Sequence, residues 1–200
     1  MTEESRGVED QPMRSDARQN RRRLLDAATE LILEVGREPA RDALAKAAGV
    51  GIATLYRHFP DPQDLLRGVA LDVLDRAIAA GEAALDEAEG GAALRRYLHS
   101  AIDIGLGAVN IVQPLLDDAD WPEQRTAAQN VLDRLVDAAQ HDKAISSYIT
   151  ATDIAYATIR FCRPLAIGLD TAEERAVAHR QLDSYLDGLA NRPSAPSARR

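Results

Sequence analysis

Apolar residues recur three and four positions apart along most of the chain, which is the spacing of amphipathic helices. The first such stretch predicts a helix over 15–35, with Ser15 as its N-cap and Gly36 as its stop. Two short helices are predicted next, over 40–48 and 52–59. Each is too short to be stable alone, so both must be held by packing against the first helix.

A long fourth helix is predicted to begin after Asp61. Asp61 can cap it, Pro62 suits its first position because no N–H is needed there, and Asp64 suits the positive end of the helix dipole. The helix is expected to reach the glycines at 90 and 91, a length of about 40 Å. Later helices are predicted over 92–109, briefly from Pro114, over 121–139, over 150–164 with Thr150 as cap, and over 171–189 with Asp170 as cap. With aromatic residues at only 4%, this pattern predicts an all-α fold.

The same pattern divides the chain into four parts. Residues 1–14 and 191–200 lack helical periodicity and are expected to be a disordered arm and a disordered tail. Between them, the helices of 15–60 form one unit and the helices of 61–190 form a larger one. A chain of 200 residues can bury a sizeable core without a metal or a disulfide.

Few features of the chain point to catalysis. Cys162 is the only cysteine, so no intramolecular disulfide is possible. The four histidines lack metal-ligand spacing, and no hydrolase, dinucleotide-binding or phosphate-loop motif is present. No apolar window approaches the roughly 18 residues of a membrane span. We therefore expect a cytoplasmic protein that has no membrane partner, needs no cofactor or metal, and is not an enzyme.

Charge is distributed unevenly along the chain, whose net charge is −8. Residues 11–60 hold nine Lys and Arg against six Asp and Glu, a balance of +3, whereas residues 61–200 hold fourteen against twenty-two, a balance of −8. A mildly basic N-terminal unit therefore precedes an acidic body. The overall negative charge thus does not exclude that the N-terminal unit binds nucleic acid.

The helical pattern is broken between Ala48 and Ile52 and restarts at once. Gly49 can adopt the left-handed conformation that closes a helix, and Val50 then becomes an apolar plug in the turn. With Leu55 facing the first helix, this arrangement is typical of a helix-turn-helix.

The exposed face of the third predicted helix carries groups suited to DNA. At about 100° per residue, Ala53 and Arg57 point away from the buried side. Thr54 and Tyr56 lie on the flanks and His58 at the edge. A methyl, a hydroxyl, a phenol and a guanidinium can contact thymine methyls, phosphates and guanine edges, and the small Ala53 lets the backbone approach the groove. The alternative is an alanine-rich helical hairpin whose polar side chains only decorate its surface.

The segment GVGIATLYRHFPDPQDLL closely resembles the recognition-helix segment of TetR-family transcriptional regulators. The resemblance covers about 18–77, with the motif at about 40–59, and the remaining chain agrees only in being helical and of similar length. It implies an N-terminal three-helix helix-turn-helix head, joined by a long fourth helix to a helical ligand-binding and dimerisation body. By position, it implies that Tyr56 and His58 contact phosphates and that Thr54 and Arg57 face phosphates or base edges.

Four positions depart from the pattern of the family. Gly51 stands where serine often caps the recognition helix, and Ile52 stands where lysine is common. Arg41 stands where an apolar residue is usual, and Pro62 where a lysine commonly holds phosphate. Candidates to replace the missing lysines are Arg18, Arg21, Arg22 and Arg41, and Ile52 is a candidate for contact with a thymine methyl. The complete set of expected DNA contacts is Arg41, Ile52, Ala53, Thr54, Tyr56, Arg57 and His58.

Within the body, large or polar-tipped residues near apolar helical faces are the candidates for lining a ligand pocket. They are Tyr97, Trp121, Arg125, Tyr148, Tyr156 and Arg160, with Cys162 nearby. For each of them, a place in the core or at an interface is the alternative. Arg160 lies in an otherwise apolar helix, and a buried guanidinium there would need an anionic partner such as Asp103 or Asp153.

The last two predicted helices are the expected dimer face, because TetR-family members usually pair these helices into a four-helix bundle. The candidate interface residues are Ile154, Phe161, Leu182, Tyr185 and Leu189. A dimer would present two recognition helices related by a two-fold axis, which suits a palindromic operator.

The sequence as a whole predicts a ligand-responsive DNA-binding transcriptional regulator, with repression as the expected mode. Its expected partners are a double-stranded DNA operator, a second copy of itself and an unidentified small-molecule effector. The alternative is a helical small-molecule binding protein with weak or lost DNA binding, which the missing lysines leave open.

Overall fold

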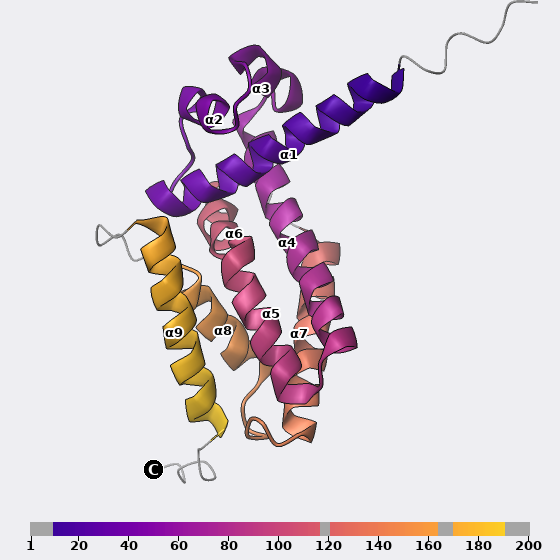
Figure 1. Cartoon of the computed structure of the whole chain (residues 1–200), viewed down its shortest axis with the longest axis vertical. Coiled ribbons are helices and arrows are strands. Elements are labelled where there is room, and N and C mark those ends of the chain that lie inside the picture. Colours follow the sequence, from indigo (N-terminus) through magenta and orange to yellow (C-terminus); the bar gives the residue numbers. More distant parts are fainter. Residues whose placement is uncertain (1–9, 117–120, 164–169, 191–200) are drawn as a thin grey trace, which may run out of the picture.

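A computed structural model describes residues 10–116, 121–163 and 170–190, and every regular element in these ranges is helical, which confirms the all-α prediction. The elements are α1 (Asp10–Val35), α2 (Arg41–Ala47), α3 (Ile52–His58), α4 (Pro62–Glu87), α5 (Gly90–Ile104), α6 (Gly107–Val112), a 3-10 turn η1 (Gln113–Leu115), α7 (Pro122–His141), α8 (Ala151–Phe161) and α9 (Thr171–Ala190). The first three helices form a head at one end, and α4 runs from this head into the bundle of the remaining helices (Figure 1). Within the described ranges, no helix combines the length and the apolar character needed to cross a bilayer.

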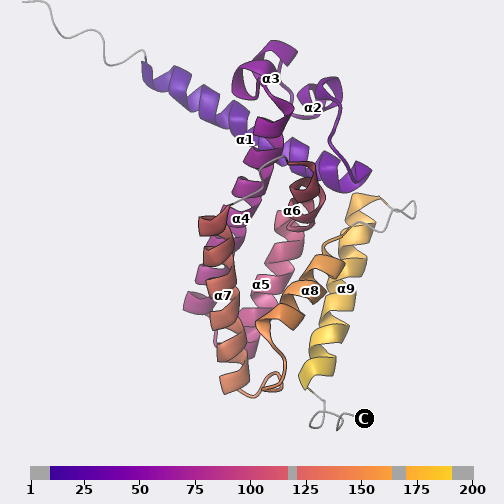
Figure 2. The same ribbon diagram turned by 180° about the vertical axis from the view of Figure 1, so that it is seen from behind.

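Helix α1 begins earlier than the sequence pattern predicts. It starts at Asp10, so Ser15 lies inside the helix and is not its N-cap. Pro12 does not prevent this start, because N–H groups in the first turn of a helix have no intrahelical acceptor. The N-terminal half of α1 projects away from the bundle in both views (Figures 1 and 2). The expected disordered arm over 1–14 is therefore wrong for residues 10–14, and its remainder and the expected tail over 191–200 lie outside the described residues.

The predicted caps of the later helices are present. Asp61 accepts a hydrogen bond from the backbone N–H of Gln63 at 2.8 Å, and Pro62 occupies the first turn of α4. Thr150 and Asp153 form a reciprocal capping box at the start of α8. Each cap satisfies donors that the first turn of a helix leaves unpaired, so these helix starts follow from local sequence alone.

One predicted helix over 92–109 is wrong, because the chain breaks between α5 and α6. Gly105 ends α5 in a left-handed conformation with φ of 83°. A Cβ atom there would lie 2.9 Å from Cγ2 of Thr29 on α1. A Cβ atom at Gly107 would lie 2.0 Å from the carbonyl oxygen of Cys162 at the end of α8. Both glycines are thus required by close packing with distant parts of the chain.

Two clusters of buried apolar side chains hold the fold together. The first includes Leu24, Leu55 and Val112, and so joins α1 and α3 to α6 and to the N-terminal part of α4. The second joins α5, α7, α8 and α9 to the C-terminal part of α4. Because α4 contributes to both clusters, the orientation of the head depends on helices of the body.

Candidate nucleic-acid interface and ligand cavity

The turn between α2 and α3 follows the geometry that its glycines predict. Gly49 has φ of 63°, and its N–H donates to the carbonyl of Lys46. The N–H of Val50 donates to the carbonyl of Ala45 at 3.0 Å, which closes the end of α2. Gly51 then starts α3 in an extended conformation, without a side-chain cap. The turn sets α3 across α1, as in a helix-turn-helix.

One side of α3 is buried. Leu55 and Phe59 belong to the cluster that contains Leu24 of α1, which confirms both as core residues. The guanidinium of Arg21 lies over the Phe59 ring, 4.6 Å from its centroid, in a cation–π contact. This packing fixes the rotation of α3 about its axis and therefore selects the face that it presents.

The opposite side of α3 is open. Ile52 is 40% exposed and Tyr56 is 50% exposed, while Ala53 and Arg57 are also exposed. Thr54 and His58, the remaining expected contacts on this helix, are half-buried at its flanks. The structure thus brings six of the seven expected DNA contacts together on one short helix at the end of the molecule (Figure 1). Their contact with DNA stays a prediction.

Arg41, the seventh expected contact, has a role inside the head. Its Nη1 donates to the carbonyl of Phe59 at 2.9 Å, and its guanidinium lies 5.6 Å from the centroid of the Tyr56 ring. Its Nη2 is buried and has no hydrogen-bond partner among the described residues. Arg41 therefore connects α2 to the C-terminal end of α3 by a hydrogen bond, and its guanidinium packs against the Tyr56 ring.

His58 lies in a positively charged environment. Burial lowers the pKa of its imidazole below the ordinary value, and the nearby Arg21 and Arg57 lower it further. The uncharged imidazole keeps one N–H, which is a suitable donor to a phosphate oxygen.

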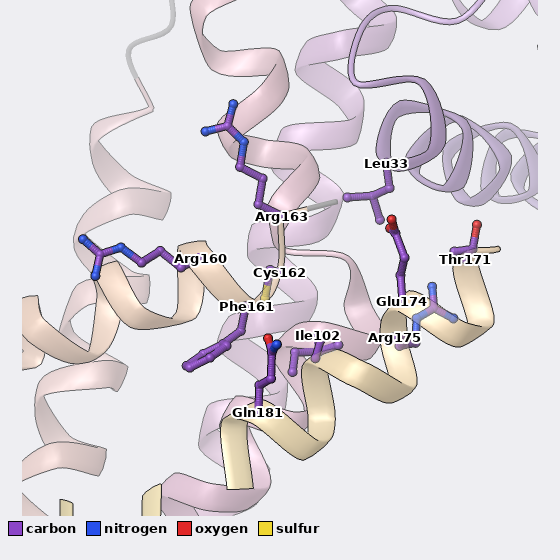
Figure 3. Close-up of a pocket in the computed structure, with 11 residues that line it drawn as sticks. Leu33, Ile102, Arg160, Phe161, Cys162, Arg163, Thr171, Glu174, Arg175 and Gln181 are labelled. Atoms are coloured by element: carbon purple, nitrogen blue, oxygen red, sulfur yellow. The ribbon is translucent and has the colours of Figure 1, made fainter. Parts of the chain in front are cut away.

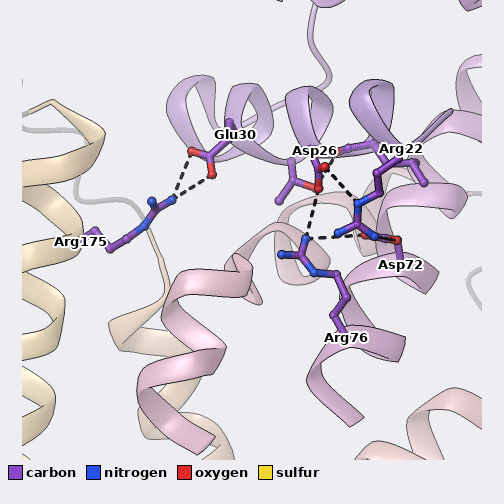
Figure 4. A network of polar contacts seen from close by, with 8 residues as sticks. Arg22, Asp26, Glu30, Asp72, Arg76 and Arg175 are labelled. Carbon is purple, nitrogen blue, oxygen red and sulfur yellow. Dashed lines mark hydrogen bonds and ion pairs between the residues drawn. The ribbon is translucent and has the colours of Figure 1, made fainter. Parts of the chain in front are cut away.

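Ion pairs connect the head to the body (Figure 4). Arg22 of α1 contacts Asp26 at 3.0 Å and Asp72 of α4 at 2.9 Å. Arg175 at the start of α9 donates to both carboxylate oxygens of Glu30 at 3.0 and 3.2 Å. The Arg22 guanidinium therefore pairs with carboxylates that fix α1 on α4, and this makes Arg22 a poor candidate for contacting phosphate in place of the missing lysines.

A cavity of about 230 Å³ lies in the body among α4, α5, α6, α7 and α8. Three of the expected ligand contacts line it, namely Tyr97, Trp121 and Arg125. Its other polar lining residues, none of which the sequence pattern predicted, are Asn110, Gln113, Gln129 and Thr158. No sequence signal marks these amides and this hydroxyl, because they lie on separate helices that only the fold brings together.

The other three expected ligand contacts do not line this cavity. Tyr148 and Tyr156 are exposed, and Arg160 lines a separate hollow of only about 60 Å³ between α8 and α9. Figure 3 shows the guanidinium groups of Arg160 and Arg163 directed outward from this hollow. Arg160 is exposed, so it needs no buried anionic partner.

The two acidic residues considered as partners of Arg160 have other contacts. Asp103 Oδ1 lies 2.9 Å from Nε2 of His179, and Asp153 belongs to the capping box of α8. Burial raises the pKa of the neighbouring Cys162 thiol to about 12, so this cysteine is not a thiolate at neutral pH. In the part of the chain that the structure describes, no group of three or more His, Cys, Asp or Glu side chains is arranged to hold a metal ion.

The expected dimer contacts divide into two groups. Ile154, Leu182 and Leu189 are buried within a single chain, so they belong to the core of the body and their assignment to an interface is wrong. Phe161 and Tyr185 are half-buried and pack against each other with ring centroids 5.5 Å apart. Apolar periodicity identified the inward faces of α8 and α9, and a partner could only meet their outward faces.

Residues 24–69 match the family model described as bacterial regulatory proteins of the tetR family. Over 93 residues, or 46% of this chain and 49% of the relative, the sequence is 42% identical to the HTH-type transcriptional repressor LfrR of Mycolicibacterium smegmatis. The chain thus spans about half the length of this curated relative.

Solved structures resemble nearly the whole chain. The TetR transcriptional regulator SCO0520 of Streptomyces coelicolor matches with a TM-score of 0.64 and 29% identity, covering 88% of this chain and 99% of that one. The regulator LfrR in complex with proflavine matches with a TM-score of 0.59 and 26% identity, covering 84% of this chain and 96% of that one. The similarity therefore includes the helical body as well as the head.

Proposed function

We propose that this chain, which belongs to the tetR family of bacterial regulatory proteins, is a transcriptional repressor that binds a palindromic operator as a homodimer and is released by a small molecule. The observation that carries the proposal is the outer face of α3, where Ala53, Tyr56 and Arg57 are exposed and Thr54 lies half-buried at the flank of a packed helix-turn-helix. These groups match the hydrogen-bonding and apolar features of the major groove and its phosphates.

The small size of α3 favours a dimer. A helix of seven residues offers a small contact surface, so high affinity requires a second copy on an adjacent half-site. The outward faces of α8 and α9 are the proposed interface. Tyr156 on α8 is 62% exposed, and Gly188 on α9 has open space around it, which allows a partner helix to approach closely.

The cavity is the proposed effector site. Leu74 and Ala77 of α4 line it, and the N-terminal part of the same helix packs in the head. A molecule that fits the cavity better when α4 is displaced would therefore change the distance between the two heads of a dimer. Such a ligand shifts binding only through its different affinities for the two states, and a 100-fold loss of operator affinity requires about 2.7 kcal/mol of coupling. The proflavine complex of LfrR supports a small-molecule role for this body.

Operator binding can be tested with the DNA upstream of the gene of this protein. Arg57→Ala and Tyr56→Phe are expected to weaken retardation of this DNA in a gel shift, while circular dichroism and sedimentation show unchanged helix content and oligomeric state. Arg96→Ala is the matched control, because it removes the same charge from α5 of the body, outside the helix-turn-helix.

Binding by the Arg57→Ala protein at the wild-type affinity would contradict the assignment of α3. If the wild-type protein fails to retard its upstream DNA yet binds small molecules, the alternative of a helical binding protein with lost DNA binding is favoured. The departures at Gly51, Ile52 and Pro62 would then explain the loss.

A further inference from the structure

We infer that the cavity of the body takes an apolar molecule that carries a carboxylate, and that Trp121 and Arg125 at the start of α7 hold this carboxylate. The inference rests on the proposed ligand-responsive function and names the chemical class of the effector. Its first support is the pattern of unpaired donors in the wall of the cavity.

Trp121 presents a donor without an acceptor. Its side chain lines the cavity and is only 5% exposed, and its Nε1 is buried without a hydrogen-bond partner among the described residues. An indole N–H can only donate, and a buried donor left unpaired is destabilising. A ligand that offers an oxygen acceptor at this place would satisfy it.

Arg125 places a positive charge beside this donor. The backbone N–H of Arg125 donates to the carbonyl of Trp121 at 3.0 Å, so the two residues lie one helical turn apart and both line the cavity. Arg125 is an exposed residue that lines the cavity. Among the described residues its guanidinium makes no ion pair, and it is the one charged group of the lining. A guanidinium can bind a carboxylate through two parallel hydrogen bonds.

The N-terminal end of α7 also favours an anionic group. This helix has 20 residues, and the positive end of its dipole coincides with Trp121 and Arg125. Glu123 also lies in the first turn, but unlike Arg125 it does not line the cavity. A buried, unpaired indole donor, an exposed guanidinium and a helix N-terminus therefore belong to one wall of the cavity, which favours an anionic acceptor over a cation.

The rest of the lining carries no charge, and apart from the amides of Asn110, Gln113 and Gln129 it is mostly apolar, which suits an uncharged remainder of the ligand. Leu74, Val109 and Ile159 provide apolar walls. Burial raises the pKa of the Tyr97 phenol to about 12, so it stays neutral at the pH of the cell. The hydroxyl of Thr158 already donates to a backbone carbonyl of its own helix at 2.7 Å. The apolar part of the ligand would thus extend from α7 towards α4 and α8.

The experiment uses two series of probes on the full-length protein: octanoate, octanamide and octylamine, and 4-tert-butylbenzoate with its amide and its benzylammonium analogue. The chain contains a single tryptophan, so its fluorescence reports binding in this cavity directly, and calorimetry supplies the affinities. We expect the acid of each series to bind about tenfold or more tightly than its amide, as a charge-assisted hydrogen bond provides. The ammonium analogues are expected to bind most weakly.

Variants separate the two donors. Arg125→Gln is expected to lower the affinity for each acid about tenfold and to leave the affinity for the amides unchanged. Trp121→Phe, measured by calorimetry, is expected to weaken acids and amides alike, because both offer an oxygen acceptor. Arg134→Gln is the matched control, since Arg134 lies on the same helix but pairs with Glu82 outside the cavity. Thermal melts verify that each variant is folded.

The inference is overturned if ammonium probes bind as tightly as the acids, if neither acid changes the fluorescence of Trp121, or if Arg125→Gln binds the acids like the wild type. Gel shifts with the same probes measure release of DNA, so that a failure of the proposed function can be distinguished from a failure of this inference. Binding of an acid without release of DNA supports the inference and contradicts the proposed coupling, whereas release of DNA by a cation alone does the opposite.

Discussion

Replacement of Arg41 by alanine distinguishes a structural role in the head from a direct contact with DNA. The sequence placed Arg41 among the DNA contacts, whereas the structure places its guanidinium between the carbonyl of Phe59 and the ring of Tyr56. A structural role predicts that Arg41→Ala loosens the C-terminal end of α3 and removes support from Tyr56. A phosphate contact predicts that only the electrostatic part of DNA binding is lost.

The magnitude follows from the contacts of the guanidinium. A hydrogen bond from a charged donor stabilises by about 1.5–3 kcal/mol, and a cation–π contact adds about 0.5–1 kcal/mol. Removing Arg41 also removes its buried, unpaired Nη2, which costs the folded wild type about 1–3 kcal/mol. We therefore expect a net loss of about 1–2 kcal/mol, and for a chain of this size each kcal/mol lowers Tm by about 2–4 °C.

Two measurements test this expectation together. Thermal unfolding followed by circular dichroism should show Tm lowered by about 2–8 °C for Arg41→Ala. Fluorescence anisotropy with operator DNA should show weaker binding but an unchanged dependence on salt. Lys46→Ala is the control for stability, because Lys46 is an exposed residue of the same helix. The reasoning is refuted if Tm stays at the wild-type value while the salt dependence of log Kd falls by about one, which is the signature of a lost phosphate contact.

Three further predictions concern single side chains. Thr150→Ala should lower the free energy of unfolding by about 1 kcal/mol in urea titrations because it removes the capping box of α8, and Thr150→Ser should retain most of that stability. Cys162, buried and with a pKa of about 12, should react with a disulfide reagent only as fast as the body unfolds, and rapid labelling of the native protein would contradict its burial. Burial lowers the pKa of the His58 imidazole, and the positive charges of Arg21 and Arg57 lower it further, so the imidazole is uncharged at neutral pH in the free protein. Phosphates of bound DNA favour its charged form, so operator affinity should rise as the pH falls from 7 towards this lowered pKa, and His58→Gln should show a flatter pH profile by anisotropy.

Features that depend on neighbouring residues could be predicted from the sequence. Asp61 caps α4 through the N–H two residues later, and the N–H groups of Gly49 and Val50 close α2 by donating to carbonyls three and five residues earlier, respectively. The exposed face of α3 was also predictable, because the burial of Leu55 and Phe59 fixes by helical periodicity which side chains point outward.

Features that depend on distant contacts could not be predicted. The break at Gly105 is required by Thr29, which lies far away in the sequence on another helix. Arg41 finds its acceptor eighteen residues later, at a carbonyl whose position depends on how α3 packs. Periodicity also cannot separate an apolar face that packs within one chain from one that packs against a partner, which is why Ile154 and Leu182 were assigned to an interface.

The cavity and the head share part of one buried core, which suggests how a ligand in the cavity would change the head. Leu74, Val109 and Trp121 line the cavity and also belong to the buried cluster that holds α1 and α3. Because packed cores adopt discrete arrangements and deform little between them, a molecule that displaces these side chains must repack the cluster beneath α3. The ion pair between Arg22 and Asp72 holds α1 to α4, so the head would follow α4 as one body. Under the proposed function, a head without the lysines that are common in TetR-family regulators would start from weaker electrostatic attraction to DNA, so a smaller coupling free energy would bring its occupancy of the operator below half.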